Sequence, residues 1–246
     1  MIRLRIHPDA AAAAHDVAAA LRSTVVASPA CVLGLPTGRT PIPVYAQLVE
    51  WVASGALSLD DVTTFNLDEF VGLGPDAQGS FQAFMRHHLF GRVDRRPAPR
   101  NFLDGLAPDL DLEAARFERA IDDAGGLDLV VLGLGTNGHI GFNEPAGELP
   151  ARTHVVSLTD ETRVANADGF GGEVPRVPTR AITMGVGTIL AAREVILLAT
   201  GASKADAVAA ACEGPLTTQV PASLLQLHPR VTVVLDAAAA ARLSRA

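Results

Sequence analysis

The 246-residue chain is poor in cysteine and in long hydrophobic stretches, and each shortage excludes a class of protein. Its two cysteines, Cys31 and Cys212, cannot build a disulfide framework, which agrees with a reducing compartment. The apolar stretches fall short of the roughly 20 residues that a membrane-crossing helix needs. The N-terminal segment MIRLRIHPDA alternates like a strand and lacks the apolar centre of a signal peptide. We therefore expect a cytoplasmic protein with no membrane partner.

Basic charge is scarce as well, and lysine is nearly absent. The formal net charge of −7 and the pI near 5.4 argue against a nucleic acid partner. Lys204 is the only lysine among 20 basic residues. A genome that favours arginine codons explains the excess of arginine over lysine. One explanation of Lys204 itself is a surface lysine without a partner. The other is a site that needs a slim, mobile ammonium group.

Strand-length apolar segments alternate with helical ones along the chain. The strand candidates are residues 31–35, 62–67, 127–134, 195–200 and 231–236, and the helix candidates are about 10–27, 42–53, 80–90, 111–124 and 203–213. Near-continuous apolar strands separated by helices predict a single-domain, Rossmann-like α/β fold over residues 1–246. Its mostly parallel sheet would carry helices on both faces, with ligands bound at the carboxyl ends of the strands.

The first chemically informative loop is LGLPTGRTP, residues 33–41, which lies between a predicted strand and a predicted helix. Backbone N–H groups at a helix N-terminus bind anions, and the hydroxyls of Thr37 and Thr40 would assist. The loop lacks the lysine and the spacing of a P-loop. An ordinary strand-to-helix turn is the alternative.

The second loop, FNLDEF at residues 65–70, places Asp68 and Glu69 directly after a strand. Adjacent residues of an extended chain point to opposite sides, so only one of these carboxylates can face a given pocket. A catalytic base and a helix cap are the two interpretations of such a pair.

The third loop, LGLGTNGHIGFNEP at residues 132–145, turns through glycines and presents an imidazole and a carboxylate, His139 and Glu144. Such a turn is suited to proton transfer, although a turn histidine bonded to local backbone is the alternative. Its glycines match G-x-G-x-x-G, but Pro145 follows where a dinucleotide fold needs a helix. We therefore expect no dinucleotide cofactor.

The fourth loop opens the predicted helix near Ser203 and places Lys204 in its first turn. A cation there is unfavourable with the helix dipole unless an anion is present. The adjacent His87 and His88 lack metal-ligand spacing, so no metal is assigned.

These four loops, in this order, resemble the glucosamine-6-phosphate deaminase (isomerase) family. The likeness extends over nearly the whole chain through SLTDETRVANA, AITMGVGT and the closing PASLLQLHPRVTVVLD. It implies conversion of glucosamine 6-phosphate and water to fructose 6-phosphate and ammonia in amino sugar catabolism, without metal or organic cofactor. It also implies a phosphorylated amino sugar as the small-molecule partner.

The resemblance assigns roles to residues of this chain. Asp68 would be the base that moves a proton between C2 and C1, and His139 would open the sugar ring. Two further positions, Asn137 and Glu144, would orient and tune that histidine. The positions that match the phosphate-binding ones are Thr37, Gly38, Arg39, Thr40 and Lys204.

The chain also departs from the family pattern. The family usually has an arginine at the position of Asp168, and relatives often have glycine at that of Arg39. We hypothesise that Arg39 supplies the missing phosphate contact. Some relatives carry aspartate where this chain has Asn137. Hexameric allosteric relatives place basic residues around the segment that matches 152–156, which here reads RTHVV with Glu148 nearby. We therefore expect a monomer or small homo-oligomer without activation by N-acetylglucosamine 6-phosphate.

Three alternatives remain open at this point. The substrate could be another amino sugar, such as galactosamine 6-phosphate, because both Arg39 and Asp168 differ from the residues that relatives usually have there. The chain could be a 6-phosphogluconolactonase-like hydrolase, or a sugar-phosphate sensor without turnover. The sequence also leaves open whether residues 147–178 close over the site as a lid.

Overall fold

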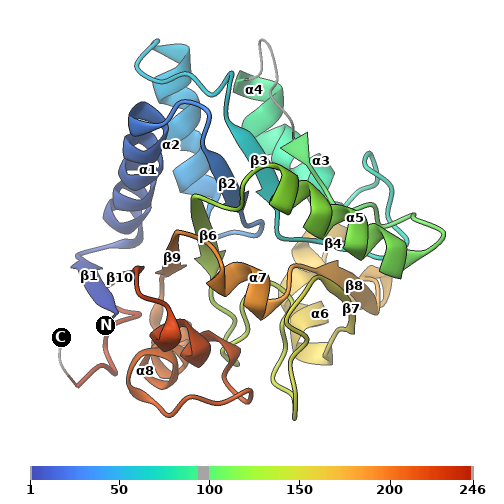
Figure 1. Cartoon of the computed structure of the whole chain (residues 1–246). Helices are drawn as coiled ribbons and strands as arrows, with labels where there is room; N and C mark the ends of the chain where they lie inside the picture. Colours follow the sequence, from blue (N-terminus) through green and yellow to red (C-terminus); the bar gives the residue numbers. More distant parts are fainter. Residues whose placement is uncertain (1, 94–99, 245–246) are drawn as a thin grey trace.

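Seven parallel strands form the main sheet of the protein. The computed structural model describes residues 2–93 and 100–244. The strands are β1 (Arg3–His7), β2 (Val32–Leu35), β3 (Thr63–Asn66), β5 (Arg100–Asn101), β6 (Leu129–Gly133), β9 (Glu194–Ala199) and β10 (Val231–Asp236). They are ordered β1-β10-β9-β6-β2-β3-β5, and every neighbouring pair is parallel. Figure 1 shows this sheet running from β1 on the left to β3 on the right.

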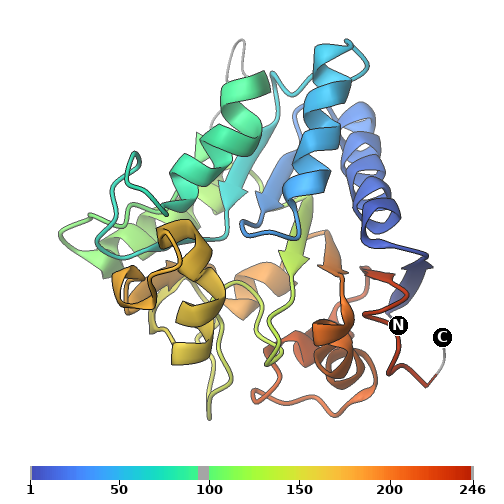
Figure 2. The same cartoon turned by 180° about the vertical axis from the view of Figure 1, so that it is seen from behind.

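A second, smaller sheet extends from the main one and is antiparallel. Its strands are β4 (Asp68–Phe70), β7 (His154–Ser157) and β8 (Arg180–Thr183), ordered β4-β8-β7. This sheet was not predicted from the sequence, because strands of three or four residues have too few positions to show a periodic pattern. Figure 2 shows the yellow-to-gold chain around this sheet beside the lower end of the green helix that contains α3.

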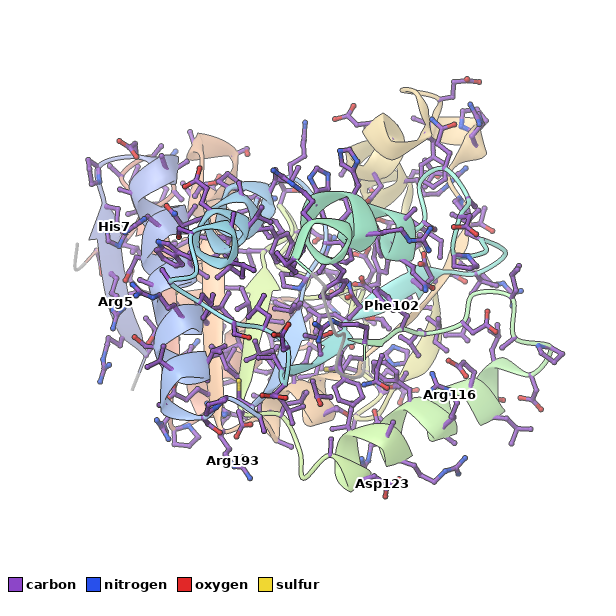
Figure 3. The ribbon with its side chains drawn as sticks, turned by 90° about the horizontal axis from the view of Figure 1, so that it is seen from above. Arg5, His7, Phe102, Arg116, Asp123 and Arg193 are labelled. Carbon is purple, nitrogen blue, oxygen red and sulfur yellow. The ribbon has the colours of Figure 1, made fainter. Side chains whose placement is uncertain are left out.

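Helices cover both faces of the main sheet. They are α1 (Ala10–Ala27), α2 (Ile42–Ala53), α3 (Phe81–Met85), the π-helical η1 (Arg86–Phe90), α4 (Gly91–Val93), α5 (Leu110–Asp123), α6 (Asp160–Asn166), α7 (Val186–Leu190) and α8 (Ala205–Glu213). Short 3-10 segments are η2 (Ala167–Phe170), η3 (Val174–Arg176), η4 (Ala202–Lys204) and η5 (Pro221–Leu227). Seen from above, α1, α2 and α3 lie on one side of the sheet and α5 on the other (Figure 3). The predicted Rossmann-like α/β architecture is confirmed.

Local sequence explains why α1 forms where it does. Its N-cap is Asp9, whose carboxylate accepts the backbone N–H of Ala12 at 2.8 Å. Its buried face repeats at helical spacing through Val17, Leu21 and Val25, which pack against the sheet. None of the helices formed by residues 2–93 and 100–244 is long and apolar enough to span a membrane.

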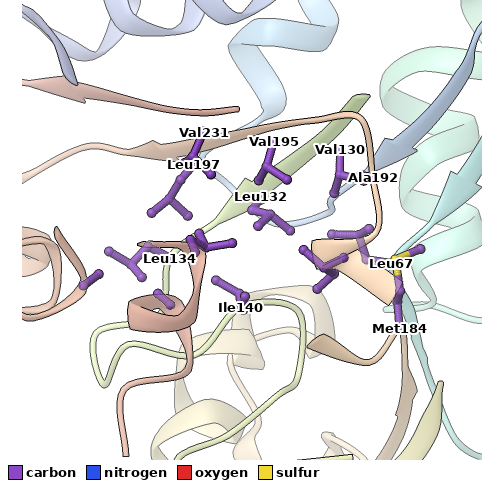
Figure 4. Close-up of a cluster of buried hydrophobic side chains, with 14 of the residues drawn as sticks. Leu67, Val130, Leu132, Leu134, Ile140, Met184, Ala192, Val195, Leu197 and Val231 are labelled. Atoms are coloured by element: carbon purple, nitrogen blue, oxygen red, sulfur yellow. The ribbon is translucent and has the colours of Figure 1, made fainter. Parts of the chain in front are cut away.

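The carboxyl ends of the strands are anchored in the hydrophobic core. Leu67, Leu134, Ile140 and Met184 are each no more than 6% exposed and belong to one buried cluster. Figure 4 shows them meeting below the ends of the central strands. Leu67, Leu134 and Ile140 each lie next to a polar or glycine residue of the second and third loops described above. The core therefore fixes the backbone of these loops.

Candidate active site

The loops after β2, β3 and β6 meet around one cavity of about 140 Å³. It is lined by Pro36, Thr37, Gly38, Arg39, Thr40, Pro41, Leu67, Asp68, Phe81, Gly133, Leu134, Gly135, His139, Gly141, Phe142 and Asn166. The parallel sheet brings these segments together because the carboxyl ends of its strands lie at one edge. Three of the four loops predicted from the sequence thus contribute to a single site.

Asp68 opens β4 and lies on the wall of the cavity, 6% exposed. Burial, followed by the charge of Glu69, raises the pKa of Asp68 from 3.8 to about 8. Burial and the charge of Asp68 together raise the pKa of Tyr45 well above its usual value. The hydroxyl of Tyr45 donates to the carbonyl of Pro36. Asp68 is therefore a carboxylate with an unusually high proton affinity.

Glu69 does not line the cavity, as the alternation along an extended strand requires. Its carboxylate accepts the backbone N–H groups of Phe70 at 2.8 Å, Phe81 at 3.0 Å and Gln82 at 3.0 Å. Burial raises its pKa to about 7, and these three hydrogen bonds oppose the rise. In the acidic pair, Asp68 thus faces the cavity and Glu69 caps α3.

His139 is supported by a buried carboxylate. Its Nδ1 lies 3.5 Å from Oε2 of Glu144, which is an ion-pair distance longer than a hydrogen bond. The same Oε2 accepts the side-chain amide of Asn137 at 2.8 Å, and the hydroxyl of Thr162 donates to Oε1. Burial opposes ionisation of Glu144, but its contacts with His139, Thr162 and Asn137 outweigh it and lower the pKa of Glu144. Glu144 is thus an ionised partner for the imidazole.

Gly135 makes room for the imidazole ring. A Cβ atom at this position would lie 2.3 Å from Nδ1 of His139, far inside van der Waals contact. The backbone N–H of Gly135 also donates to the carbonyl of His139 at 2.9 Å, which closes the turn. Only glycine allows the ring to lie this close to the strand end.

The loop after β2 has backbone N–H donors that are not satisfied by any acceptor of the described residues. Within the described ranges, the backbone N–H groups of residues 37–40 make no hydrogen bond to the protein. Lys204 ends η4, precedes α8 and makes no side-chain hydrogen bond or ion pair with any described residue. Burial and then the charge of Arg39 lower the pKa of Lys204. Unpaired N–H groups beside two neighbouring cations are a combination of groups that can bind an anion.

The structure therefore brings most of the sequence-predicted residues to one site. Thr37, Gly38, Arg39, Thr40, Asp68 and His139 line the cavity, with Asn137 and Glu144 behind the imidazole. Lys204 is outside the lining but close enough to Arg39 for electrostatic interaction. The sequence reasoning missed the contributions of Tyr45, Phe81, Gly135, Phe142 and Thr162. For Gly135, a glycine just before a histidine-bearing turn was the available signal.

Residues 2–93 and 100–244 contain no cluster of three or more His, Cys, Asp or Glu side chains that could hold a metal ion. His139 and Glu144 already face each other in this part of the chain.

Comparisons with known proteins place the chain in a family. Residues 8–234 match the sequence profile of the family described as glucosamine-6-phosphate isomerases/6-phosphogluconolactonase. The chain belongs to this family. A glucosamine-6-phosphate deaminase of Rhodopirellula baltica is 49% identical over 245 residues, which cover 100% of this chain and 97% of the relative.

Solved structures of the family agree in fold. The structure of a monomeric glucosamine-6-phosphate deaminase superposes with a TM-score of 0.94 at 39% identity, covering 98% of this chain and 100% of the other. The 6-phosphogluconolactonase of Trypanosoma cruzi reaches a TM-score of 0.77 at 20% identity, covering 99% of this chain and 97% of the other. The latter likeness concerns the fold alone.

The two departures from the family pattern meet in space. Nη1 of Arg39 donates to Oδ2 of Asp168 at 3.1 Å, joining the loop after β2 to η2. The side chains are 79% and 72% exposed, so the pair is weak and open to competition from a ligand. Asp168, which does not itself line the cavity, therefore contacts a residue that does.

Proposed function

We propose that the protein is a glucosamine-6-phosphate deaminase. The observation that carries this proposal is the pairing, in one cavity, of the buried carboxylate of Asp68 with the imidazole of His139 backed by Glu144. An aldose-ketose isomerisation needs both a base for a carbon-bound proton and a group that exchanges protons with sugar oxygens. The identity of 49% to a deaminase over the whole chain supports the same activity.

The first step opens the pyranose ring. In this proposal, His139 takes the proton of the O1 hydroxyl and delivers one to O5, so the C1–O5 bond breaks and an aldehyde forms at C1. Ionised Glu144 stabilises the charged imidazolium, and Asn137 holds Glu144 in place through its amide. The backbone N–H of His139 donates to the side-chain oxygen of Asn137 at 3.2 Å, which fixes the turn.

The second step moves a proton from C2 to C1. The carboxylate of Asp68 takes the C2 proton while the aldehyde oxygen takes a proton from water, which yields an enolamine. Asp68 then returns its proton to C1, and the nitrogen gives up a proton to the hydroxide left by that water, which leaves an imine at C2. Water adds to this imine, and ammonia leaves to give the C2 ketone. Burial gives Asp68 a higher proton affinity than an exposed carboxylate, which suits removal of a proton from carbon. Asp68 ends the cycle in its starting form, so no cofactor is consumed.

The phosphate belongs at the loop after β2 in this proposal. The unpaired N–H groups of residues 37–40, the hydroxyls of Thr37 and Thr40, and the ammonium of Lys204 supply donors and positive charge. Arg39 exchanges its contact with Asp168 for the phosphate or shares itself between them. An anion would relieve the unfavourable proximity of Arg39 and Lys204.

Ammonia release tests the function directly. Purified protein is given glucosamine 6-phosphate, with galactosamine 6-phosphate, free glucosamine and 6-phosphogluconolactone in parallel. We expect ammonia from glucosamine 6-phosphate, with kcat lowered by roughly a hundredfold or more in Asp68→Asn. Asp60→Asn, which neutralises an exposed carboxylate, serves as the control and should leave the rate unchanged. Lactone hydrolysis without ammonia, or release from another sugar alone, would overturn the assignment.

The phosphate assignment has its own test in two substitutions of opposite effect. Arg39→Gly should raise KM for glucosamine 6-phosphate about tenfold, as expected when one charge-assisted contact is lost. Asp168→Asn should lower this KM, because a carboxylate no longer competes for Arg39. The KM for free glucosamine should move in neither variant. An unchanged KM for the phosphorylated sugar in Arg39→Gly would refute the role of this residue.

We further propose that the enzyme acts as a monomer or small homo-oligomer in the cytoplasm, without activation by N-acetylglucosamine 6-phosphate. The likeness to a structure described as monomeric supports the first part. Sedimentation of the purified protein tests its size. Saturation curves with and without N-acetylglucosamine 6-phosphate test its regulation, and sigmoidal kinetics abolished by that compound would contradict the proposal.

A further inference from the structure

Glu69 is a buried acidic residue that the proposed mechanism does not use. It is 3% exposed and adjacent in sequence to the proposed base, yet it does not line the cavity. A carboxylate buried this deeply is costly unless it is hydrogen-bonded, and two of its donors come from the first turn of α3, 12 and 13 residues away in sequence. Its place therefore depends on the joint geometry of β4 and α3.

The helix that Glu69 caps contributes a wall of the cavity. Phe81 donates its N–H to Glu69, and its ring lines the cavity. That ring stacks on Phe142 with centroids 5.8 Å apart and an interplanar angle of 19°. Phe70, which follows Glu69, packs against Phe81, with ring centroids 4.8 Å apart. One carboxylate thus ties the strand that carries Asp68 to the aromatic wall on which a substrate would rest.

We propose that Glu69 is a positioning residue for the reaction, which holds α3 and Phe81 against β4 and places a second carboxyl group behind Asp68. This inference rests on the proposed deaminase function. The three N–H donors favour the ionised form of Glu69, and a second carboxylate next to it is then harder to ionise. The structure thereby separates the two acids into one anchored by three N–H groups and one that faces the cavity as a proton carrier.

The other groups around the pair are compatible with this division. Tyr45 on α2 interacts electrostatically with Asp68, and its raised pKa keeps it neutral at working pH. His139 and Arg39 are the ionisable side chains that line the cavity together with Asp68. Across the small sheet, Thr183 and Ile182 stand opposite Asp68 and Glu69 and carry no charge. Like-charge repulsion from Glu69 is accordingly the second cause, after burial, of the raised pKa of Asp68.

The test is the pH dependence of kcat/KM in Glu69→Gln. Because the free enzyme must ionise Asp68, kcat/KM should rise with pH along an acid limb. Loss of the charge at Glu69 should move this limb to lower pH by roughly one unit or more. KM should rise as well, because the amide N–H₂ meets the N–H of Gln82 and one bond to α3 is lost. Glu69→Asp, which keeps the charge on a shorter side chain, should raise KM and leave the limb in place.

Ser80→Ala is the matched structural control. Ser80 caps the same helix through its hydroxyl oxygen, which accepts the N–H of Ala83 at 3.0 Å, and it carries no charge. It should lower stability and leave the acid limb at its wild-type position. An acid limb of Glu69→Gln that coincides with wild type would overturn the proposal. If Glu69→Gln does not fold, a limb that moves in Ser80→Ala or in Glu69→Asp would overturn it instead.

The two proposals can fail separately. If wild-type protein releases no ammonia from any amino sugar phosphate, the function is wrong. If wild type is active and only the expected shift of the limb is missing, the role of Glu69 is wrong.

Discussion

Replacing Asp68 by asparagine should make the protein inactive and, above neutral pH, more stable. The pKa of this carboxyl is raised in the folded protein, so the folded state holds the proton more tightly than the unfolded chain. Wild-type stability from this group is therefore present at low pH and lost as pH rises toward about 8. Asparagine has no charge to bury and escapes this loss.

The magnitude follows from the two pKa values. A rise from 3.8 to about 8 corresponds to roughly 6 kcal/mol at 1.36 kcal/mol per pKa unit, reached in full above both values. Leaving a buried amide incompletely hydrogen-bonded costs roughly 1 to 3 kcal/mol. A net advantage of roughly 3 to 5 kcal/mol remains for Asp68→Asn in mildly alkaline solution. Between pH 5 and pH 8 this advantage should grow by about 3 to 4 kcal/mol.

Urea unfolding at pH 5, 6, 7 and 8 measures this growth. The free energy of unfolding in water is compared between wild type, Asp68→Asn and the exposed-site control Asp60→Asn, with m-values checked for equality. If the free energy of unfolding changes with pH in the same way in wild type and Asp68→Asn, the argument that ionisation of this carboxyl destabilises the folded protein is refuted. Such a result would also remove the reason for a strong base at this position. A substitution that removes a catalytic group and makes the protein more stable is an example of a stability–activity trade-off.

Two further substitutions probe the support of His139. Gly135→Ala should lower kcat by tenfold or more, because the new Cβ would lie 2.3 Å from the imidazole and must displace it; ammonia release measures this, and unchanged kcat would mean that the ring has room to move. Thr162→Val removes the hydroxyl that donates to Glu144, which should raise the pKa of that carboxyl and lower kcat most strongly at acidic pH. A pH–rate profile identical to wild type would show that Thr162 only fills space.

The five inner strands of the main sheet were predictable because buried parallel strands are continuous apolar runs bounded by polar turns, whereas the two-residue edge strand β5 was not predicted. Residues 231–236 were predicted as a strand and form β10, and residues 42–53 were predicted as a helix and form α2. The meeting of Asp68 and His139 followed from the rule that strand ends of a parallel sheet share one edge.

The small sheet and the contacts that position the site residues could not be predicted from such sequence patterns. β4 is a strand because β8 pairs with it, with Glu69 opposite Ile182. Its three residues alone show no sequence pattern that would predict this pairing. The division of labour between Asp68 and Glu69 depends on α3, which begins at Phe81. The contact between Arg39 and Asp168 joins residues 129 positions apart. Only tertiary structure fixes such relations.

The single lysine of the chain offers a site for a chemical label next to the cavity. Lys204 supplies the only lysine ε-amine in the chain, and its lowered pKa leaves more of that amine neutral and nucleophilic than an exposed lysine would offer. Reductive methylation with isotope-labelled formaldehyde would therefore place a single side-chain methylamine signal beside the anion-binding loop. Titration of inorganic phosphate, followed through that resonance, would report occupancy of this end of the cavity without any substitution in the protein.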